Sequence, residues 1–363
     1  MKKNDDVSIS LIQQYSLEEA KLHLTLVQEN VMSDNIFLSS HWLYSWLESL
    51  SSLPQMCLFN IDNKLIGIAF LGKQHCPYGD IYYLNQTGRQ ADDQVWIEHN
   101  DVFCMHEKLV ACREALLEYL SRQPKFHKLI VSLCKDENWR HKKIFLWETD
   151  MHPTQYVDIA ALRKQAKTHL ESTSKNSRSS IKRSQKYIES KYGPISMHKI
   201  TDSLDALIPS EIAPLHIEQW GETEYGSGFA NPRFVNFHKI FCSQAPAHIN
   251  IEVLKFSAGE FVLGYLYFIN KGNSANFYLS AINYSDKNNK YKPGLVMHTM
   301  AISDYAAKQY DAYDFLAGEA RYKESLSNGR YNMYTLHLAN KRPLQRILFN
   351  IKVLKQKLGN IKG

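Results

Sequence analysis

One stretch near the C-terminal end, residues 290–324, constrains the fold more than any other part of this chain. The segment KYKPGLVMH (290–298) opens a helix at a Pro-Gly break, and YDFLAGEARYKES (313–325) follows one helix later. The first segment predicts a helix, and the second predicts a strand that ends in a polar loop. One helix N-terminus and one strand end therefore face a common cleft, where functional loops are usually found.

The Pro-Gly break predicts an anion site. Gly294 has no side chain to cover the backbone N–H groups of the first helical turn, and such donors attract anions together with the helix dipole. The lysines at this helix end carry the wrong sign for the dipole, and a bound polyanion such as phosphate would reverse that penalty. The alternative is a plain turn with solvated lysines. The predicted binding residues are Lys290, Lys292, Gly294, Leu295, Val296 and Met297.

Length and composition indicate a globular protein of two domains. The chain has 363 residues, of which 44% are hydrophobic and 22% charged. Its apolar runs are far shorter than the ~18 residues of a membrane span, and the first ten residues lack the apolar core of a secretion signal, so we expect a cytoplasmic protein. The six cysteines show no paired spacing, which predicts reduced thiols and no metal site.

The net charge of +6 is concentrated in two places. Residues 325–363 contain eight Lys or Arg and no acid, so the other residues sum to 6 − 8 = −2. The run STSKNSRSSIKRSQK (172–186) adds five cations and no acid. Because the basic residues are local, the overall balance is not that of a nucleic-acid-binding protein.

The two halves of the chain show a similar order of elements, and together they predict an α+β fold. In the second half, strands at 249–256, 261–270 and 276–282 read as an antiparallel meander, followed by the Pro-Gly helix and by strands at 313–316 and 332–338. The first half repeats a hairpin at 56–72, a helix at 104–121 and a strand at 128–133, with Gly67 standing where Gly264 stands. This order predicts an internal duplication in which only the second copy has the Pro-Gly helix.

These segments together resemble the GNAT superfamily. More narrowly, they are similar to the tandem-GNAT acetyltransferases associated with cellulose and exopolysaccharide biosynthesis, which are relatives of the Fem-type aminoacyl transferases. The Q/R-x-x-G-x-G/A loop of simple GNAT enzymes is absent here. The segments that carry the resemblance are FLSSHWLYSWLE (37–48), SKNSRSSIKRSQK (174–186), LHIEQWG (215–221), KPGLVMH (292–298) and YDFLAGEARYK (313–323).

The resemblance implies two tandem GNAT-like domains, each a mixed, mainly antiparallel sheet flanked by helices. It also implies acetyl-CoA or another acyl-CoA as co-substrate, with the pyrophosphate at the Pro-Gly helix and no metal. We expect an N-terminal domain, a basic linker helix, a C-terminal domain with the acyl-CoA site and a basic terminal helix, at 1–160, 161–195, 196–340 and 341–363.

Acyl transfer to an amine requires a base for the amine proton and an acid for the leaving thiolate. Glu319 is predicted as the base, and Tyr322 and Lys323 as the acid or as groups that orient the acceptor. Solvent exposure of the glutamate and lysine, with the tyrosine ring packed on the sheet, is the alternative. Substrate contacts are predicted for His216 and Trp220, which lie four residues apart on one helix face, and for Asp314. Core packing or a structural hydrogen bond is the alternative for these three.

The predicted function is acyl-CoA-dependent N-acyl transfer, with acetyl as the expected group, to an amine such as an amino sugar in polysaccharide or cell-envelope biosynthesis. The acceptor is either a small molecule or lipid-linked. A Fem-like transferase that uses aminoacyl-tRNA is one alternative, and nucleic acid is a partner only under that alternative. The other is a non-catalytic, membrane-docked partner in a polysaccharide assembly complex.

The C-terminal tail has the pattern of a basic amphipathic helix. After Pro343, apolar residues recur at a spacing of three and four, with Lys and Arg between them. This pattern predicts either a helix packed on the core or peripheral docking on the anionic inner membrane face.

Overall fold

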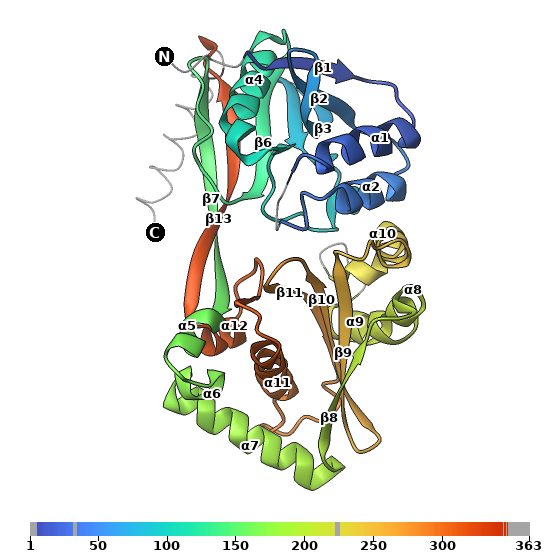
Figure 1. Ribbon diagram of the computed structural model, residues 1–363, viewed down its shortest axis with the longest axis vertical. Coiled ribbons are helices and arrows are strands. Elements are labelled where there is room, and N and C mark those ends of the chain that lie inside the picture. Colours follow the sequence, from blue (N-terminus) through green and yellow to red (C-terminus); the bar gives the residue numbers. More distant parts are fainter. Residues whose placement is uncertain (1–5, 32–34, 222–225, 344, 346, 348–363) are drawn as a thin grey trace.

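The computed structural model describes residues 6–31, 35–221, 226–343, 345 and 347. These residues form one mixed sheet of thirteen strands with helices on both faces, which confirms the α+β prediction (Figure 1). Within the same residues, we find no helix with the length and hydrophobicity needed to span a membrane.

The first half of the chain supplies the upper part of Figure 1. Its elements are β1 (Ser8–Ile12), α1 (Leu17–Gln28), α2 (Ser40–Ser49), β2 (Gln55–Ile61), β3 (Lys64–Cys76), β4 (Gly79–Leu84), α3 (Gln90–Asp93), β5 (Phe103–Cys104), the 3₁₀ turn η1 (His106–Lys108), α4 (Leu109–Arg122), β6 (Phe126–Cys134) and β7 (Ile144–Asp158).

The second half supplies the lower part and also the strand β13, which continues into the upper part. Its elements are α5 (Ile159–Lys164), α6 (His169–Ser172), α7 (Lys175–Tyr192), β8 (Ile195–Ile200), α8 (Leu204–Leu207), the π-helical turn η2 (Ile208–Ile212), α9 (Ala213–Trp220), the 3₁₀ turn η3 (Gly228–Ala230), α10 (Pro232–Ser243), β9 (Asn250–Ala258), β10 (Phe261–Asn270), β11 (Ser274–Ile282), α11 (Pro293–Ala307), β12 (Ala312–Asp314), α12 (Arg321–Leu326) and β13 (Gly329–Asn340).

The two halves have the same internal topology, as the duplicated sequence pattern predicts. In the first half, the meander β2–β3–β4 leads through α4 to β6, which pairs parallel with β4. In the second half, β9–β10–β11 leads through α11 to β12, which pairs parallel with β11. The match extends to a β-bulge just before Gly67 in β3 and another just before Gly264 in β10.

Two long strands, β7 and β13, connect the halves and run from the top of the molecule down to α5 and α12 (Figure 1). β13 pairs with β7 along its full length, and its Tyr334–Ala339 segment also pairs with β6. The last strand of the predicted 196–340 domain is therefore inserted into the sheet of the first half. The domain boundary predicted from the sequence therefore differs from the spatial arrangement of the strands. Between β6 and β7, β13 has a neighbour on each side, so the backbone hydrogen-bonding groups along both of its edges find partners.

The halves also share a hydrophobic core. The side chains of α1, α2, β2 and β3 pack with those of α8, α10 and β9–β11 in one continuous cluster. At its centre the Trp42 ring meets Phe237 and Phe241 of α10, with ring centroids 4.8 and 5.3 Å apart. On the opposite face of the sheet, α4 and the pair α7 and α11 cover separate clusters in the two halves. Because one core spans both halves, the chain does not fold as two independent units.

The predicted linker, 161–195, holds most of α5 and all of α6 and α7, and the basic run forms α7. The six cysteines are free thiols.

At the start of the C-terminal tail, the Lys341 N–H donates to the Lys143 carbonyl at 2.8 Å and Arg342 Nη2 donates to the Gln123 carbonyl at 3.0 Å. The remainder of the predicted terminal helix, 348–363, lies outside the described residues.

Candidate functional site

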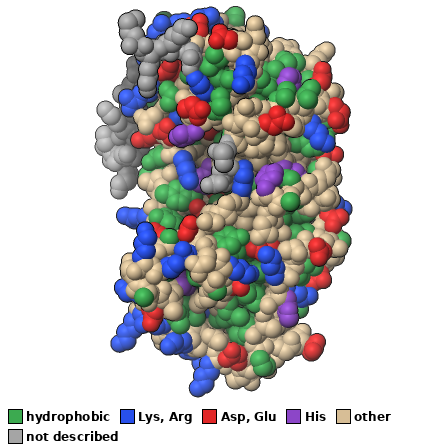
Figure 2. All heavy atoms as spheres, viewed as in Figure 1, with side chains coloured by type: hydrophobic (Ala, Val, Ile, Leu, Met, Phe, Trp, Pro, Cys, Tyr) green, Lys and Arg blue, Asp and Glu red, His purple; other side chains and the backbone are tan. Residues whose placement is uncertain are grey.

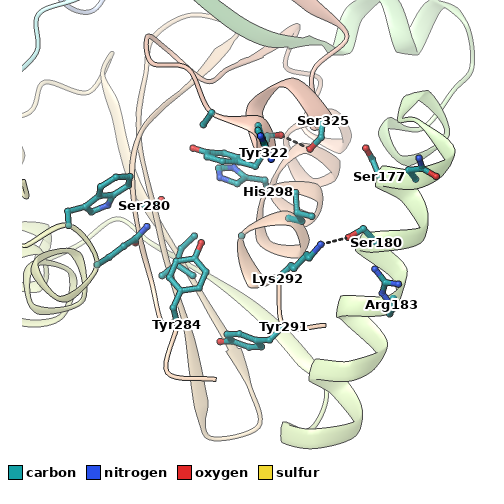
Figure 3. Close-up of a pocket in the computed structure, with 18 residues that line it drawn as sticks. Ser177, Ser180, Arg183, Ser280, Tyr284, Tyr291, Lys292, His298, Tyr322 and Ser325 are labelled. Carbon is teal, nitrogen blue, oxygen red and sulfur yellow. Dashed lines mark hydrogen bonds between the residues drawn. The ribbon is translucent and has the colours of Figure 1, made fainter. Parts of the chain in front are cut away.

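A cavity of about 760 Å³ lies in the second half, between α7, α9, the end of β11, α11 and α12 (Figure 3). Its wall is mainly aromatic and aliphatic on the β11 side, and hydroxyl-rich and cationic on the α7 side. The residues that line it are Asn176, Ser177, Ser180, Arg183, Gln219, Trp220, Ser280, Ile282, Tyr284, Tyr291, Lys292, Gly294, Leu295, His298, Ala320, Arg321, Tyr322 and Ser325.

The cavity opens where two parallel strands end their pairing. β11 and β12 pair only from Ser274 to Asn276 and from Ala312 to Asp314, while β11 continues to Ile282. The last part of β11 therefore has no β12 residue beside it, and Ser280 and Ile282 line the cavity instead. The helix that crosses between the two strands, α11, begins at this opening, as the Pro-Gly motif predicts.

The N-terminus of α11 has fewer free donors than the sequence suggests. Pro293 has no N–H, the Leu295 N–H donates to the Lys292 carbonyl at 3.2 Å, and the Lys292 N–H donates to Ser184 Oγ at 2.9 Å. No side chain caps the helix, and Gly294, in the first turn, lines the cavity.

Two of the predicted binding residues in this turn do not reach the cavity. The side chains of Val296 and Met297 are buried in the core behind α11, and helical geometry directs their N–H groups to the first carbonyls of the helix. The prediction of an anion site made from several first-turn N–H groups is therefore wrong for these two residues. Gly294 and Leu295 do line the cavity.

Two cations stand at the same end of the cavity. Lys292 Nζ donates to Ser180 Oγ at 3.3 Å across the gap between α11 and α7, and Arg183 projects from α7 beside it (Figure 3). Hydrophobic side chains lie open at the centre of the lower half of the molecule, and Lys and Arg side chains follow its lower left edge along α7 (Figure 2). Lys290 is exposed and is not among the lining residues, contrary to the prediction.

Arg183 and the serines of α7 are binding candidates that the sequence reasoning missed. Ser177, Ser180 and Ser184 recur at intervals of three and four, so they form one face of the helix. Small side chains along that face let α7 approach the α11 N-terminus closely. The spacing of these serines can be seen in the sequence. The neighbouring residues, however, do not indicate that this face of α7 contacts α11.

Asp286 holds α7 in place against the loop that leads to α11. Its Oδ2 accepts hydrogen bonds from Tyr187 Oη, Tyr192 Oη and Lys191 Nζ, each at 2.9 Å. Desolvation raises the pKa of the Asp286 carboxyl, but these bonds, together with one from the Asn288 N–H at 2.9 Å, outweigh it and lower the pKa. The carboxylate thus fixes the wall of the cavity that carries Arg183.

Tyr322 lies at the other end of the cavity wall, on α12. Its ring stacks on the His298 imidazole, with centroids 5.1 Å apart and an interplanar angle of 19° (Figure 3). Burial raises the pKa of Tyr322, so its hydroxyl is protonated at neutral pH and can donate. His298 is fully buried, hydrogen-bonded through Nδ1 to Tyr313 Oη at 2.6 Å, and burial lowers its pKa to about 3. A neutral imidazole therefore supports the Tyr322 ring.

Lys323 does not face the cavity, contrary to its predicted direct role. Its side chain is 7% exposed, and Nζ donates to the carbonyls of Phe315, Leu316 and Ala317 at 2.9, 3.2 and 2.8 Å. An ammonium group has three donors, and all three are used here. The lysine thus fixes the loop before α12 instead of meeting a substrate.

Of the other predicted site residues, one lines the cavity and three do not. Trp220 lines the cavity and is 57% exposed, whereas Glu319 is exposed on the loop before α12 but outside the lining. His216 is buried, bonds to Ser227 Oγ at 2.7 Å and does not line the cavity. The Asp314 carboxylate accepts from the Leu316 N–H and from Tyr331 Oη, each at 2.8 Å, as the structural alternative predicts. The predicted substrate contacts of His216 and Asp314 are therefore absent from this cavity.

Comparison with known protein families points to the same part of the chain that forms the cavity. Residues 175–324 match the family described as the acetyltransferase (GNAT) domain, and this range includes every lining residue except Ser325. A search of curated protein sequences gave no match.

Several solved structures share the fold of nearly the whole chain. The crystal structure of FemX is 10% identical, with a TM-score of 0.53, and the match covers 94% of this chain and 100% of FemX. The C-terminal domain of a putative lysylphosphatidylglycerol synthetase from Agrobacterium fabrum is 9% identical, with a TM-score of 0.52 and coverages of 93% and 97%. A conserved protein of unknown function from Bacteroides thetaiotaomicron is 12% identical, with a TM-score of 0.52 and coverages of 92% and 100%.

At these identities the likeness shows the fold alone, and the domain match concerns residues 175–324. The duplicated topology, the parallel strands that separate beside an uncapped helix N-terminus, and the matched domain agree with one another. Residues 175–324, which hold nearly all of the cavity wall, match the acetyltransferase (GNAT) domain, and this match supports an acyltransferase.

Proposed function

We propose that the cavity binds an acyl-CoA, with acetyl-CoA as the expected donor, and that the protein transfers the acyl group to an amine. The observation that carries the proposal is the arrangement of the cavity wall. Lys292, Arg183 and the Gly294 N–H stand at the α11 N-terminus, and the protonated Tyr322 hydroxyl lies beside an apolar wall.

This arrangement matches the chemistry of the donor. A pyrophosphate is stabilised by a helix N-terminus and by cations, particularly by an arginine. The aromatic and aliphatic wall, which includes Ile282, Leu295 and Tyr291, suits the uncharged pantetheine arm.

The reaction is direct attack of the neutral amine on the thioester carbonyl. The C–N bond forms, the C–S bond breaks, the amine proton leaves to a base, and the thiolate takes a proton. Tyr322 is the proposed acid, because its hydroxyl faces the cavity and is protonated. Glu319 remains the predicted base, acting through water from its exposed loop. No covalent enzyme intermediate is required.

Calorimetric titration of the purified protein with CoA, acetyl-CoA and desulfo-CoA tests the donor. Saturable binding of all three supports the proposal, because the recognised parts are the phosphates and the pantetheine arm. Absence of binding to the wild-type protein would refute it.

Charge removal at the cavity should weaken donor binding in a salt-dependent way. We expect Arg183→Ala and Lys292→Ala each to lower CoA affinity about 10-fold at low ionic strength, because each removes a charge-assisted contact to phosphate. The loss should be smaller at high salt, where the Debye length is short. Lys182→Ala is the matched control, since Lys182 is exposed on α7 next to Arg183 but does not line the cavity. Equal losses for Lys182→Ala and Arg183→Ala would contradict the assignment.

A second candidate function is Fem-like transfer from aminoacyl-tRNA. The observation that favours it is the basic surface of α7, where Lys175, Lys182 and Lys186 are exposed beside the cavity. Filter binding with aminoacyl-tRNA distinguishes the two donors. Tight tRNA binding without CoA binding would replace the acyl-CoA proposal.

The proposed acceptor is an amine such as an amino sugar, either free or lipid-linked, in polysaccharide or cell-envelope assembly. This part of the proposal rests on the resemblance described above. A panel of amino sugars with acetyl-CoA, followed by mass spectrometry of the products, tests it. If CoA binds but no amine is acylated, the remaining reading is a non-catalytic partner in a polysaccharide assembly complex.

For the basic tail we propose peripheral docking on an anionic membrane. Deletion of residues 348–363 leaves the anchoring bonds of Lys341 and Arg342 in place. We therefore expect the melting temperature to change by less than about 2 °C, because the described core is untouched. Sedimentation with anionic vesicles should be lost. A large fall in melting temperature, with no vesicle binding by the full chain, would instead show that the tail packs on the core.

A further inference from the structure

A segment of the first half, Val95–Asn100, reaches across the molecule to the loop that precedes α12. The Val95 carbonyl accepts from Tyr278 Oη of β11 at 2.7 Å, and the Trp96 ring lies 5.4 Å from the Phe234 ring of α10. Trp96 and His99 have left-handed φ angles of 48° and 49°, which are uncommon for residues other than glycine. Such backbone geometry is unfavourable and persists only where the surroundings enforce it.

Glu98, between these two residues, makes the contact with the loop. Its side chain is 6% exposed, and both carboxylate oxygens accept from the Ala317 N–H, at 3.1 and 2.9 Å. The Gln155 carbonyl of β7 also accepts from the Phe315 N–H, at 3.1 Å. Burial raises the pKa of Glu98, while the bond from Ala317 and the nearby Lys323 ammonium favour its charged form.

The loop is thus held from two sides. Lys323 Nζ binds its carbonyls, Glu98 binds its N–H, and Leu316 within it has a φ of 56°. Burial lowers the pKa of Lys323, and the charges of Glu98 and Asp314 oppose that shift. Loss of Glu98 would leave the lysine with weaker support for its charge and the Ala317 N–H without a partner, a loss that is costly in a buried site.

The loop controls the position of Tyr322, because Tyr322 precedes Lys323 on the same turn of α12. Its ring forms the cavity wall against His298. A misplacement of about 1 Å in a group that takes part in the reaction can lower the rate by a factor on the order of 100.

We propose that Glu98 is a positioning residue for the transfer reaction: the first half of the chain completes the site by fixing the loop from which Tyr322 faces the cavity. This role rests on the proposed function, because it assigns Tyr322 to the reaction. It also explains what the first half contributes, since its own helix α4 starts without a Pro-Gly break.

Glu98→Gln is the decisive variant, because the amide keeps the shape but replaces one of the two oxygens that accept from the Ala317 N–H with an NH2 donor. Glu252→Gln is the matched control. Glu252 is also a buried glutamate, 1% exposed, but its partners Lys199, Asn270 and Tyr305 lie on β8, β10 and α11. Three quantities are measured for both variants: steady-state kinetics with acetyl-CoA and an amine, the melting temperature, and hydrogen–deuterium exchange of peptides that cover residues 312–326.

For Glu98→Gln we expect a fall in kcat of about 10-fold or more, KM for acetyl-CoA within about threefold of wild type, and faster exchange at 312–326. For Glu252→Gln we expect a lower melting temperature, with kcat and exchange at 312–326 close to wild type. Wild-type exchange at 312–326 in folded Glu98→Gln would overturn the proposal, and so would an equal fall in kcat in both variants.

The exchange measurement keeps this test separate from that of the donor. If the wild-type protein does not bind CoA, the proposed function fails, and exchange still decides whether Glu98 holds the loop. If Glu98→Gln does not fold, the wild-type protein provides the test. Its peptide containing Ala317 should exchange no faster than peptides from β12, and rapid exchange there would overturn the proposal.

Discussion

Tyr322→Phe is expected to lower kcat for acyl transfer by about 100-fold, the usual contribution of a general acid. CoA affinity should remain within about threefold of wild type, because the substitution removes only the hydroxyl and keeps the ring on His298. The thiolate that leaves the thioester would then have to take its proton from water. Steady-state kinetics with acetyl-CoA and an identified acceptor, together with calorimetry, measure both quantities.

Tyr291→Phe is the control for this prediction. Tyr291 also lines the cavity, but its hydroxyl donates to the Asn283 carbonyl at 2.8 Å and has a structural role. We expect a small loss of stability, near 1 kcal/mol, and nearly unchanged kcat. If Tyr322→Phe keeps wild-type turnover and Tyr284→Phe loses it, the acid is Tyr284, the other tyrosine on the open side of the cavity.

The same assay examines the predicted base. Because Glu319 is exposed and outside the cavity lining, we expect Glu319→Gln to lower kcat less than Tyr322→Phe does. A loss as large as that of Tyr322→Phe would show that the Glu319 loop moves to the acceptor during the reaction.

Gly294→Val is expected to reduce CoA affinity by a factor on the order of 100 while leaving the fold intact, because it removes a contact made by backbone alone. A Cβ at this position would lie 3.0 Å from Ile282 Cδ1 and 3.6 Å from Tyr284 Oη, so a side chain enters the cavity beside the α11 N-terminus. Both neighbouring atoms are side-chain ends, which can shift. The φ angle of Gly294 is not left-handed, so the loss would come from steric cover of the N–H and not from backbone strain.

Gly294→Ala supplies the graded control for the anion site. Its single methyl group should weaken CoA binding less than the valine does, and circular dichroism should show the same helix content for all three proteins. Unchanged CoA affinity in Gly294→Val would refute the assignment of this helix end as the phosphate site.

The sequence was sufficient to predict the meander, the Pro-Gly helix and the duplication. These depend on local features: apolar runs bounded by turn residues in β9 and β10, a Pro-Gly pair at the start of α11, and a glycine after each bulge. Periodicity and turn residues act over a few positions, so they can be read without knowing the rest of the structure. Tyr322 and Trp220 were found in the same way, because each lies in a motif next to a strand end or a helix end.

Tertiary structure alone decided which of these residues meet. β13 inserts between β6 and β7, Arg183 reaches the α11 N-terminus from α7, and Glu98 reaches Ala317 across 219 positions. Lys323 and Val296, both predicted at the site, instead satisfy loop carbonyls and fill the core. The physical reason is that burial and hydrogen-bond satisfaction are properties of the packed whole. A local pattern determines which face of an element is apolar or polar, whereas long-range packing determines what that face contacts.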